Sequence, residues 1–531
     1  MKSFVKQARS LLPVLIGLIV MQAERPKAQT FTNFYNFQAA STNQNEMWTN
    51  HFGAFPTGAL LLFGSTLYGT TLHGGTNGTG CIYSVGTNGV GFTNLYFFSA
   101  LATNKSGIST NRDGADPAGG LIVSGSTLYG VNWYGGTNGE GTIFSISTDG
   151  TGFATLHHFA AGATNSSLSL FTNSDGATPF GGLILSSATL YGTTGYGGTN
   201  GNGTVFAVQT NGVGFTNLHA FSILVSSNNS DGANPYATLL LEGGTLYGTT
   251  QFGGTNGNGT IFSLTTNGIA FTNLHNFARL VDWGTGPYAN IFTNGDGANP
   301  RGQVILAGNT LYGTGTFGGL YGYGTVFSLA TNGTSFTNLH NFAAGGLDLS
   351  DFFSITNSDG AWPQAGVTLW SNTLYGVCEY GGLGLGTVFS LGTNSGNFTV
   401  LHYFPKGSTL TILPNSADNT NSDGAYPQTP LIVSAGGFYS SAAYGGLGGS
   451  GSLFNVALGS VVSTPSLAIN RSGTNVMVSW PTNFTGYALY STTNLAPAVW
   501  DIVSQRAVIV AGLYVVTNGD SGTSEFYRLS R

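Results

Sequence analysis

The chain has few charged residues, and the sign of its charge excludes one large class of partner. Only 6% of its 531 residues are charged, whereas about 25% are charged in an average soluble protein. Residues 31–461 hold five basic and sixteen acidic side chains, which gives this part a formal charge of −11. A nucleic-acid-binding protein needs an excess of positive charge, so we expect no nucleic-acid partner.

Cysteine is also scarce. The two cysteines, Cys81 and Cys378, lie in different contexts far apart in the sequence. We therefore expect two small buried thiols rather than a disulfide, and a zinc site built from cysteines is excluded by number.

Long apolar runs are missing as well. Residues 11–21 are apolar, but this stretch is too short to cross a membrane. Because it follows Lys2, Lys6 and Arg9, residues 1–28 are predicted to be a signal peptide that is cleaved after Ala28. A retained N-terminal anchor is the alternative. No later segment is long and apolar enough to span a membrane, so we expect a secreted or outer-surface protein without a transmembrane span.

Glycine and aromatic residues are abundant instead. The chain holds 84 glycines, and 41% of its residues are hydrophobic and 13% aromatic. This hydrophobic content argues against disorder. A weakly charged chain with regularly spaced aromatic residues fits many short strands joined by glycine turns.

Two short phrases recur seven times, at a spacing of about 60 residues. Variants of Phe-Thr-Asn-Leu-His-x-Phe start at Phe31, Phe92, Phe153, Phe215, Phe271, Phe336 and Phe398. The phrase Leu-Tyr-Gly, altered in its last copy, places its tyrosine at Tyr68, Tyr129, Tyr191, Tyr247, Tyr312, Tyr375 and Tyr439. Seven matching units of this length indicate a repeat architecture.

Each unit has the pattern of a propeller blade. Residues 215–268 contain four β-rich runs separated by Gly or Asn turns, and four strands per repeat are typical of a blade. A parallel β-helix is the alternative, but its coils are shorter. The first unit begins with an isolated strand and the last unit lacks that strand, so residues 31–37 are predicted to complete the last blade. We therefore predict an all-β fold: a seven-bladed β-propeller over residues 29–459, closed by its N-terminal strand.

The repeat resembles a known family. The runs TLYGTT-x-x-GG, G-T-[VI]-F-S and TNG-x-x-FTNLH are similar to those of the GloVer tandem-repeat family of secreted bacterial proteins, over residues 31–457. The glycine doublets followed by a T-[VI]-F strand also resemble kelch blades. The resemblance implies a repeat fold and export, but it implies no reaction.

A smaller module is predicted after the repeats. A linker at 460–465 precedes strands expected at residues 466–470, 476–480, 486–491, 500–503, 507–517 and 525–529. The phrases VSWP, GYALYSTTNL and FYRL resemble a small fibronectin- or immunoglobulin-like module. The resemblance implies a β-sandwich over residues 466–531, with Trp480 and Trp500 in its core.

Six repeats carry the phrase Asn-x-Asp-Gly-Ala-x-Pro before the innermost strand, near the predicted mouth of the channel. Its aspartates are Asp113, Asp175, Asp231, Asp296, Asp359 and Asp423. Carboxylates around one opening suit calcium, although each repeat supplies only one and calcium takes six to eight oxygens. The favoured alternative is an Asx-type turn in which the aspartate caps backbone amides before the glycine.

Five histidines recur at one position of the repeat, and two repeats carry a tyrosine there. They are His157, His219, His275, His340 and His402, with Tyr35 and Tyr96 in the other two. Because one histidine per blade keeps them too far apart to share a metal, we expect a structural hydrogen bond on the outer strand.

The loops between blades vary most, and several hold aromatic residues beside charged ones. These loops are expected to open on one face of the propeller. The ligand-binding candidates on that face are Trp133, Arg279, Asp282, Trp283, Asp351, Trp362 and Tyr380, with Glu379 beside them. Tryptophan and tyrosine near carboxylates suit stacking on sugar rings. Packing of the loops on themselves is the alternative.

These features favour an exported, monomeric, non-catalytic protein that binds a polysaccharide or a cell-surface protein. A propeller-type carbohydrate-active enzyme, a lyase or a hydrolase, is the second hypothesis. It needs two carboxylates at glycosidase spacing, for which Asp282 and Asp351 are the nominated pair. A purely structural surface protein is the third.

Overall fold

The computed structural model describes residues 30–530, apart from 43–46, 166–169, 283–290, 348–354, 407–419, 435, 459–466, 473–474, 482–487, 494–499, 506, 511–512 and 520–525. The chain divides into two compact units, whose described residues run from 30 to 457 and from 458 to 530. Throughout these residues the secondary structure is β-strand, with no α-helix. Accordingly, the described part of the chain holds no helix that is long and apolar enough to cross a membrane.

The larger unit contains seven four-stranded antiparallel sheets, which gives it an all-β, propeller-like fold. Six of them follow the chain from the inner strand to the outer strand. The first two are β4 (Leu61–Phe63), β5 (Thr66–Thr71), β6 (Cys81–Gly86) and β7 (Thr93–Phe97), then β10 (Ile122–Ser124), β11 (Thr127–Asn132), β12 (Thr142–Ser147) and β13 (Ala154–His158). The third and fourth are β16 (Ile184–Ser186), β17 (Thr189–Thr194), β18 (Thr204–Gln209) and β19 (Thr216–Ala220), then β20 (Leu240–Glu242), β21 (Thr245–Thr250), β22 (Thr260–Thr265) and β23 (Phe271–Asn276). The fifth and sixth are β26 (Ile305–Ala307), β27 (Thr310–Gly315), β28 (Thr325–Ala330) and β29 (Thr337–Asn341), then β32 (Thr368–Trp370), β33 (Thr373–Cys378), β34 (Thr387–Gly392) and β35 (Thr399–Tyr403).

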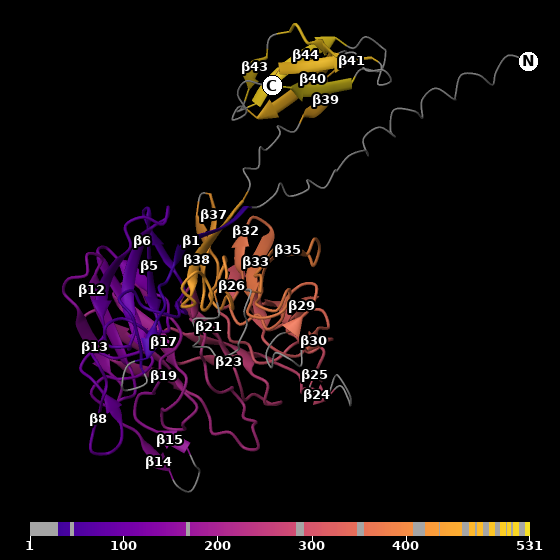
Figure 1. Ribbon diagram of the computed structural model, residues 1–531. Helices are drawn as coiled ribbons and strands as arrows, with labels where there is room; N and C mark the ends of the chain where they lie inside the picture. Colours follow the sequence, from indigo (N-terminus) through magenta and orange to yellow (C-terminus); the bar gives the residue numbers. More distant parts are fainter. Residues whose placement is uncertain are drawn as a thin grey trace, which may run out of the picture. The chain divides into compact units, whose positions relative to one another are not determined.

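The seventh sheet joins the two ends of the repeat region. Its strands are β36 (Ile432–Ser434), β37 (Gly437–Ala442), β38 (Ser452–Ala457) and β1 (Thr30–Asn36). β1 pairs with β38 in antiparallel register, with Phe31 opposite Val456. Figure 1 shows indigo β1 beside orange β37 and β38, so the start of the described chain lies next to its last repeat.

Short hairpins decorate the connections from an outer strand to the next inner strand. They are β2 (Ser41–Thr42) with β3 (Trp48–Thr49), β8 (Ala102–Thr103) with β9 (Ser109–Thr110), β14 (Ala163–Asn165) with β15 (Leu170–Thr172), β24 (Val281–Asp282) with β25 (Phe292–Thr293), and β30 (Gly346–Leu347) with β31 (Ile355–Thr356). These connections differ in length between repeats, whereas the sheets do not.

The two middle strands of each sheet are buried on both faces, which is why their sequences are nearly continuous apolar runs. Tyr191 and Val205 of one sheet share a buried cluster with Leu246 and Phe262 of the next. The glycine of Leu-Tyr-Gly is required by this packing. A Cβ at Gly248 would lie only 2.5 Å from the ring of Phe262, which faces it across the β21–β22 ladder.

Both cysteines lie in this packed interior. Cys81 and Cys378 are buried and unpaired, which confirms the prediction of two buried thiols. They replace residues of the repeat without adding a cross-link.

The smaller unit contains two further sheets. One orders β39 (Ala468–Ser472), β40 (Asn475–Pro481), β44 (Leu513–Gly519) and β43 (Val508–Val510), and the other orders β42 (Asp501–Ile502), β41 (Ala488–Thr492) and β45 (Phe526–Ser530). Trp480 is buried with Val478, Leu489 and Val516, as predicted for a core tryptophan, whereas Trp500 is only half-buried.

One predicted strand of this unit is wrong. Residues 507–517 form two strands, β43 and β44, in which Val510 pairs with Leu513. A hydrophobic run does not distinguish one long strand from a hairpin, and the glycine in the sequence between these strands was the available turn signal.

Candidate functional site

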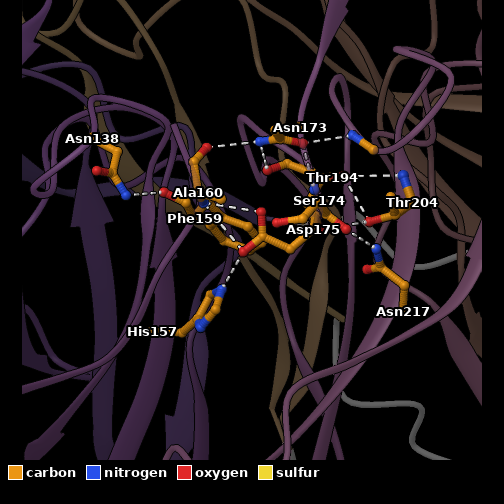
Figure 2. Close-up of polar contacts among 12 residues, drawn as sticks. Asn138, His157, Phe159, Ala160, Asn173, Ser174, Asp175, Thr194, Thr204 and Asn217 are labelled. Atoms are coloured by element: carbon orange, nitrogen blue, oxygen red, sulfur yellow. Dashed lines mark hydrogen bonds and ion pairs between the residues drawn. The ribbon is translucent and has the colours of Figure 1, made fainter. Parts of the chain in front are cut away.

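The asparagine of the Asn-x-Asp-Gly-Ala-x-Pro phrase holds the connection between repeats together. In Figure 2, Asn173 Oδ1 accepts the N–H of Gly176 at 2.9 Å and of Gly198 at 2.7 Å, while Nδ2 donates to the carbonyls of Gly176 and Ala160. The bond to the glycine doublet recurs in every repeat, from Asn50, Asn111, Asn173, Asn229, Asn294, Asn357 and Asn421. The predicted alternative was an Asx-type turn in which the aspartate caps backbone amides before the glycine. In the structure the asparagine two residues earlier makes this turn, by accepting the N–H of the glycine.

The aspartate instead binds the outer strand of the preceding sheet. Asp175 accepts the N–H of Ala160 at 2.9 Å, and its carboxylate is hydrogen-bonded to His157 Nε2 at 2.8 Å (Figure 2). The same histidine–aspartate contact, at 2.9–3.0 Å, joins His219 to Asp231, His275 to Asp296, His340 to Asp359 and His402 to Asp423. The structural hydrogen bond predicted for these histidines is confirmed for His157, His219, His275 and His340.

The two repeats without histidine show what this contact needs. Tyr96 takes the place of histidine and donates through its hydroxyl to Asp113 at 2.8 Å. Tyr35 stands at the histidine position of the other repeat, and Phe52 stands at the position of its aspartate partner. The histidine and the aspartate are therefore both replaced here. Burial alone would raise the pKa of Asp231, but hydrogen bonds from His219 and Ser222 outweigh it and lower that pKa.

These carboxylates are therefore already engaged in protein contacts. Among the described residues, no three His, Cys, Asp or Glu side chains are grouped so that they could hold a metal ion. Calcium at the six aspartates stays a prediction.

The residue before the proline of the same phrase has a left-handed backbone in all seven repeats. The seven φ values lie between 52° and 61°, at Phe55, Asp116, Thr178, Asn234, Asn299, Trp362 and Tyr426. Side chains other than Gly, Asn and Asp rarely adopt this conformation. Backbone hydrogen bonds on both sides fix it: the N–H of Trp362 donates to Tyr323, and its carbonyl accepts from the N–H of Glu379. Such imposed strain is common beside functional sites.

A cavity of about 730 Å³ opens where these segments converge, lined by residues from the connections of all seven repeats. Two positions of the repeat supply eleven of the 25 residues in its wall. The residue after the proline contributes Thr57, Ala118, Phe180, Tyr236, Arg301, Gln364 and Gln428. The third residue after Leu-Tyr-Gly contributes Leu72, Trp133, Gln251 and Glu379. These two positions differ widely between repeats, whereas the proline recurs in all seven repeats and Leu-Tyr-Gly in six.

One side of the cavity is a continuous chain of polar side chains, which we call the polar chain: Gln251, Arg301, Gln364, Glu379 and Gln428. Arg301 Nη1 donates to Gln364 Oε1 at 2.9 Å, Gln364 Nε2 donates to one oxygen of Glu379, and Gln428 Nε2 donates to the other at 2.6 Å. With the Gln251 amide turned so that its oxygen faces Arg301, that oxygen accepts from Nε at 2.9 Å and from Nη2 at 2.7 Å.

Glu379 is the only carboxyl among the described residues that line the cavity, and it is 6% exposed. Burial raises the pKa of Glu379 to about 7, because the hydrogen bonds from Gln428 and Gln364 and the charge of Arg301 offset only part of the desolvation. The group therefore lies near the midpoint of its titration at neutral pH, and it exchanges a proton where an ordinary glutamate is fully ionised.

The other side of the cavity is apolar and aromatic, with Leu72, Trp133, Phe180, Tyr196 and Tyr236. The next residue after Glu379 and its equivalents is aromatic in every repeat, and we call these residues the aromatic rim: His73, Tyr134, Tyr196, Phe252, Phe317, Tyr380 and Tyr444. Tyr134, Tyr196 and Phe252 are 40–44% exposed. Exposed rings beside buried amide, guanidinium and carboxyl groups make a wall that can both stack on a ligand and hydrogen-bond to it.

The predicted ligand-binding residues fall into three groups. Trp133 lines the cavity. Trp362 and Tyr380 lie beside it, with ring centroids 4.8 Å apart, next to Phe317 and Tyr426. Arg279 and Asp282 are exposed on the β23–β25 connection and do not line the cavity, and Trp283 and Asp351 lie outside the described residues.

Sequence reasoning missed most of the polar chain. Glu379 was noted beside the candidates, but Gln251, Arg301, Gln364 and Gln428 were not. For Arg301, Gln364 and Gln428, the signal was the position directly after the recurring proline, whose residue type changes from repeat to repeat.

The sheets and the shared cavity define a propeller-like repeat protein. Its repeats match the model of the Gloeobacter/Verrucomicrobia repeat over residues 160–294 and 221–411. The repeats in this part of the chain are thus of the Gloeobacter/Verrucomicrobia (GloVer) family, as the sequence predicted. No curated protein matches the chain.

Several solved structures are similar in part. An oligogalacturonate lyase in complex with manganese is 11% identical with a TM-score of 0.41, and the match covers 82% of this chain and 98% of that one. A family PL25 ulvan lyase is 10% identical with a TM-score of 0.38, covering 88% and 95%. A chain of a nidogen/laminin complex is 13% identical with a TM-score of 0.31, covering 57% and 89%. Likeness at this level says nothing about activity.

Proposed function

We propose that this chain is an exported, non-catalytic carbohydrate-binding protein whose ligand site is the cavity between the polar chain and the aromatic rim. The carrying observation is that the exposed rings of Tyr196 and Phe252 line the same cavity of about 730 Å³ as the hydrogen-bonding side chains of the polar chain, of which Gln251 and Glu379 are buried. Sugars present apolar ring faces and hydroxyl groups together, which such a site matches. The export part of the proposal rests on the signal-like residues 1–28.

The proposal includes a finer description of the fold. The seven sheets are taken as the blades of one propeller, which the β1–β38 pairing closes. Support comes from the cavity, to whose lining every repeat contributes. The two sheets of the smaller unit are taken as a β-sandwich of the fibronectin or immunoglobulin kind, supported by their shared core around Trp480.

Binding is favoured over hydrolysis by the number of carboxyl groups. A glycosidase uses two carboxyl groups about 5–10 Å apart, whereas the described lining of the cavity holds Glu379 alone. Asp282, one of the nominated pair, lies on the exposed hairpin β24–β25.

A polysaccharide panel tests the proposal. The full chain is incubated with neutral and acidic polysaccharides, and both retained protein and newly released reducing or unsaturated ends are measured. We expect retention without new ends. Released ends would favour the enzyme hypothesis, and no retention on any polysaccharide would favour a cell-surface protein partner or a structural role.

Matched variants locate the site. Tyr196→Ala and Phe252→Ala each remove an exposed ring of the rim, and each should weaken binding about three- to tenfold. Ile269→Ala is the control, because Ile269 is 82% exposed on the β22–β23 turn, at the opposite end of β22 from Phe252. Equal loss in the control would contradict the placement of the site.

A further inference from the structure

Arg301 carries a half-buried positive charge that forms no ion pair with a carboxylate within the described part of the chain. Every ion pair found there is between a histidine and an aspartate. The contacts of the guanidinium are the amide oxygens of Gln251 and Gln364. Burial lowers the pKa of Arg301 and the charge of Glu379 offsets part of this, while the group stays charged at any ordinary pH. A half-buried charge whose direct hydrogen-bond partners are neutral amides is costly, so its presence in the wall of a cavity needs an explanation.

Glu379 does not supply the missing partner. Gln364 lies between the two groups and hydrogen-bonds to both of them. With a pKa of about 7, the carboxyl is also partly neutral at the pH where Arg301 is fully charged. The net charge of the polar chain is therefore positive at and below neutral pH.

The geometry leaves part of Arg301 free for a ligand. A guanidinium has five N–H donors in a planar fork, and the contacts to Gln251 and Gln364 account for three. Arg301 is also close enough to Tyr236 and Tyr196 to interact with them electrostatically. These tyrosines line the same cavity, so aromatic faces stand next to a guanidinium with spare donors.

We propose that the cavity binds a sugar that carries a carboxylate, a uronate, with Arg301 pairing with the carboxylate and the neighbouring aromatic rings stacking on the sugar. This inference rests on the proposed carbohydrate-binding function and names the ligand class. The planar fork of arginine matches a carboxylate with two parallel hydrogen bonds. The other four cations of residues 31–461, Lys105, Arg112, Arg279 and Lys406, do not line the cavity, so recognition of the anionic group is assigned to one residue.

The test compares a uronate oligosaccharide with the same oligosaccharide after its carboxyl groups are reduced to alcohols. Binding of each to the full chain is measured by titration calorimetry at constant salt. We expect at least about tenfold tighter binding of the uronate form, since hydrogen bonds to charged groups contribute about 1.5–3 kcal/mol. Equal affinities, or tighter binding of a sulfated neutral glycan or of an acidic peptide, would overturn the inference.

Variants separate this inference from the proposed function. Arg301→Gln places at this position the residue that the next two repeats carry as Gln364 and Gln428, so the fold should be kept, which a thermal melt checks. This variant should bring the affinity ratio of the two forms close to one. Arg279→Gln, at an exposed cation outside the cavity, should leave the ratio unchanged.

Failure of the uronate inference and failure of the proposed carbohydrate-binding function give different results. If both forms bind equally, or if Arg301→Gln keeps the preference for uronate, the sugar-binding function stands and the role of Arg301 falls. If neither form nor any neutral glycan binds, the proposed function and the inference fall together.

Discussion

The imidazole ring of His402 stacks on the phenyl ring of Phe31, with centroids 3.5 Å apart and planes 4° from parallel. The two residues come from opposite ends of the repeat region: Phe31 from β1 and His402 from β35 of the sixth sheet. The same stack joins each of the other neighbouring sheets, for example His219 and Phe271 with centroids 4.0 Å apart. Strand β1 therefore makes the contacts of an ordinary repeat strand.

Phe31→Ala is expected to destabilise the repeat unit as much as Phe271→Ala does. Each change removes a half-buried ring that stacks on a histidine of the preceding sheet, at a cost of about 1–3 kcal/mol. Urea denaturation of the two variants measures the free energy of unfolding. A large effect at Phe271 with none at Phe31 would show that β1 is not an integral strand of the last sheet.

Replacement of His219 should separate the hydrogen bond from the stack. His219→Tyr and His219→Phe both keep a flat ring over Phe271, but only tyrosine can donate to Asp231, as Tyr96 does to Asp113. Because the phenylalanine variant removes one hydrogen bond from the buried Asp231 carboxylate, which keeps those from Ser222, it should be less stable by about 1–3 kcal/mol. Equal free energies of unfolding would mean that the hydrogen bond adds nothing to the stack.

What recurs in the chain could be predicted from sequence, because identical phrases must occupy equivalent places. The histidine hydrogen bonds and the burial of both cysteines follow from this. The role of Asn173 did not, since asparagine and aspartate both suit a turn before glycine and only the contacts show which one makes the cap. The cavity was missed because its residues do not recur. Arg301 and Gln364 occupy the same position in two repeats and contact each other, but the residue type at this position changes from repeat to repeat.

The predicted loop residues show a further limit of sequence reasoning. Arg279 and Asp282 were selected because charge and aromatic character concentrate in their loop. The structure places both on an exposed connection outside the cavity, because a long connection can extend away from the sheets. Trp133 comes directly after a strand, so its place in the wall follows from the repeat itself.

Thr178→Asn is expected to stabilise the protein by about 0.5–1 kcal/mol. Thr178 has φ of 54°, which a β-branched side chain adopts only under strain. Asparagine tolerates this conformation, and at the equivalent position Asn234 donates to the carbonyl of Gly195 at 2.7 Å. By analogy, the new side chain should donate to the carbonyl of Trp133.

The reverse change provides the control for this prediction. Asn234→Thr should lower the free energy of unfolding, because it introduces the strain and removes the hydrogen bond. Chemical denaturation of both variants checks the pair. If both changes shift stability in the same direction, backbone conformation at this position does not determine it.

Glu379 should make the protein less stable as the pH rises. Its pKa is raised from 4.5 to about 7 in the folded chain, so between these values the unfolded chain loses a proton that the folded chain keeps. The folded state then binds more protons, and the free energy of unfolding falls with rising pH from about 4.5 until it levels off near 7. The full loss is about 3 kcal/mol at most.

Glu379→Gln should remove this decline, because the amide has a similar shape and does not ionise. The free energy of unfolding in urea at pH 5, 6, 7 and 8 measures it, with Glu242→Gln on the exposed β20–β21 turn as the control that keeps the decline. Tyr380 and Tyr444, which also face Glu379, do not interfere, because burial raises the pKa of both hydroxyls further above this range. An unchanged decline in Glu379→Gln would mean that the carboxyl is already ionised in the folded cavity throughout this range, so that Arg301 has an anionic neighbour before any ligand binds.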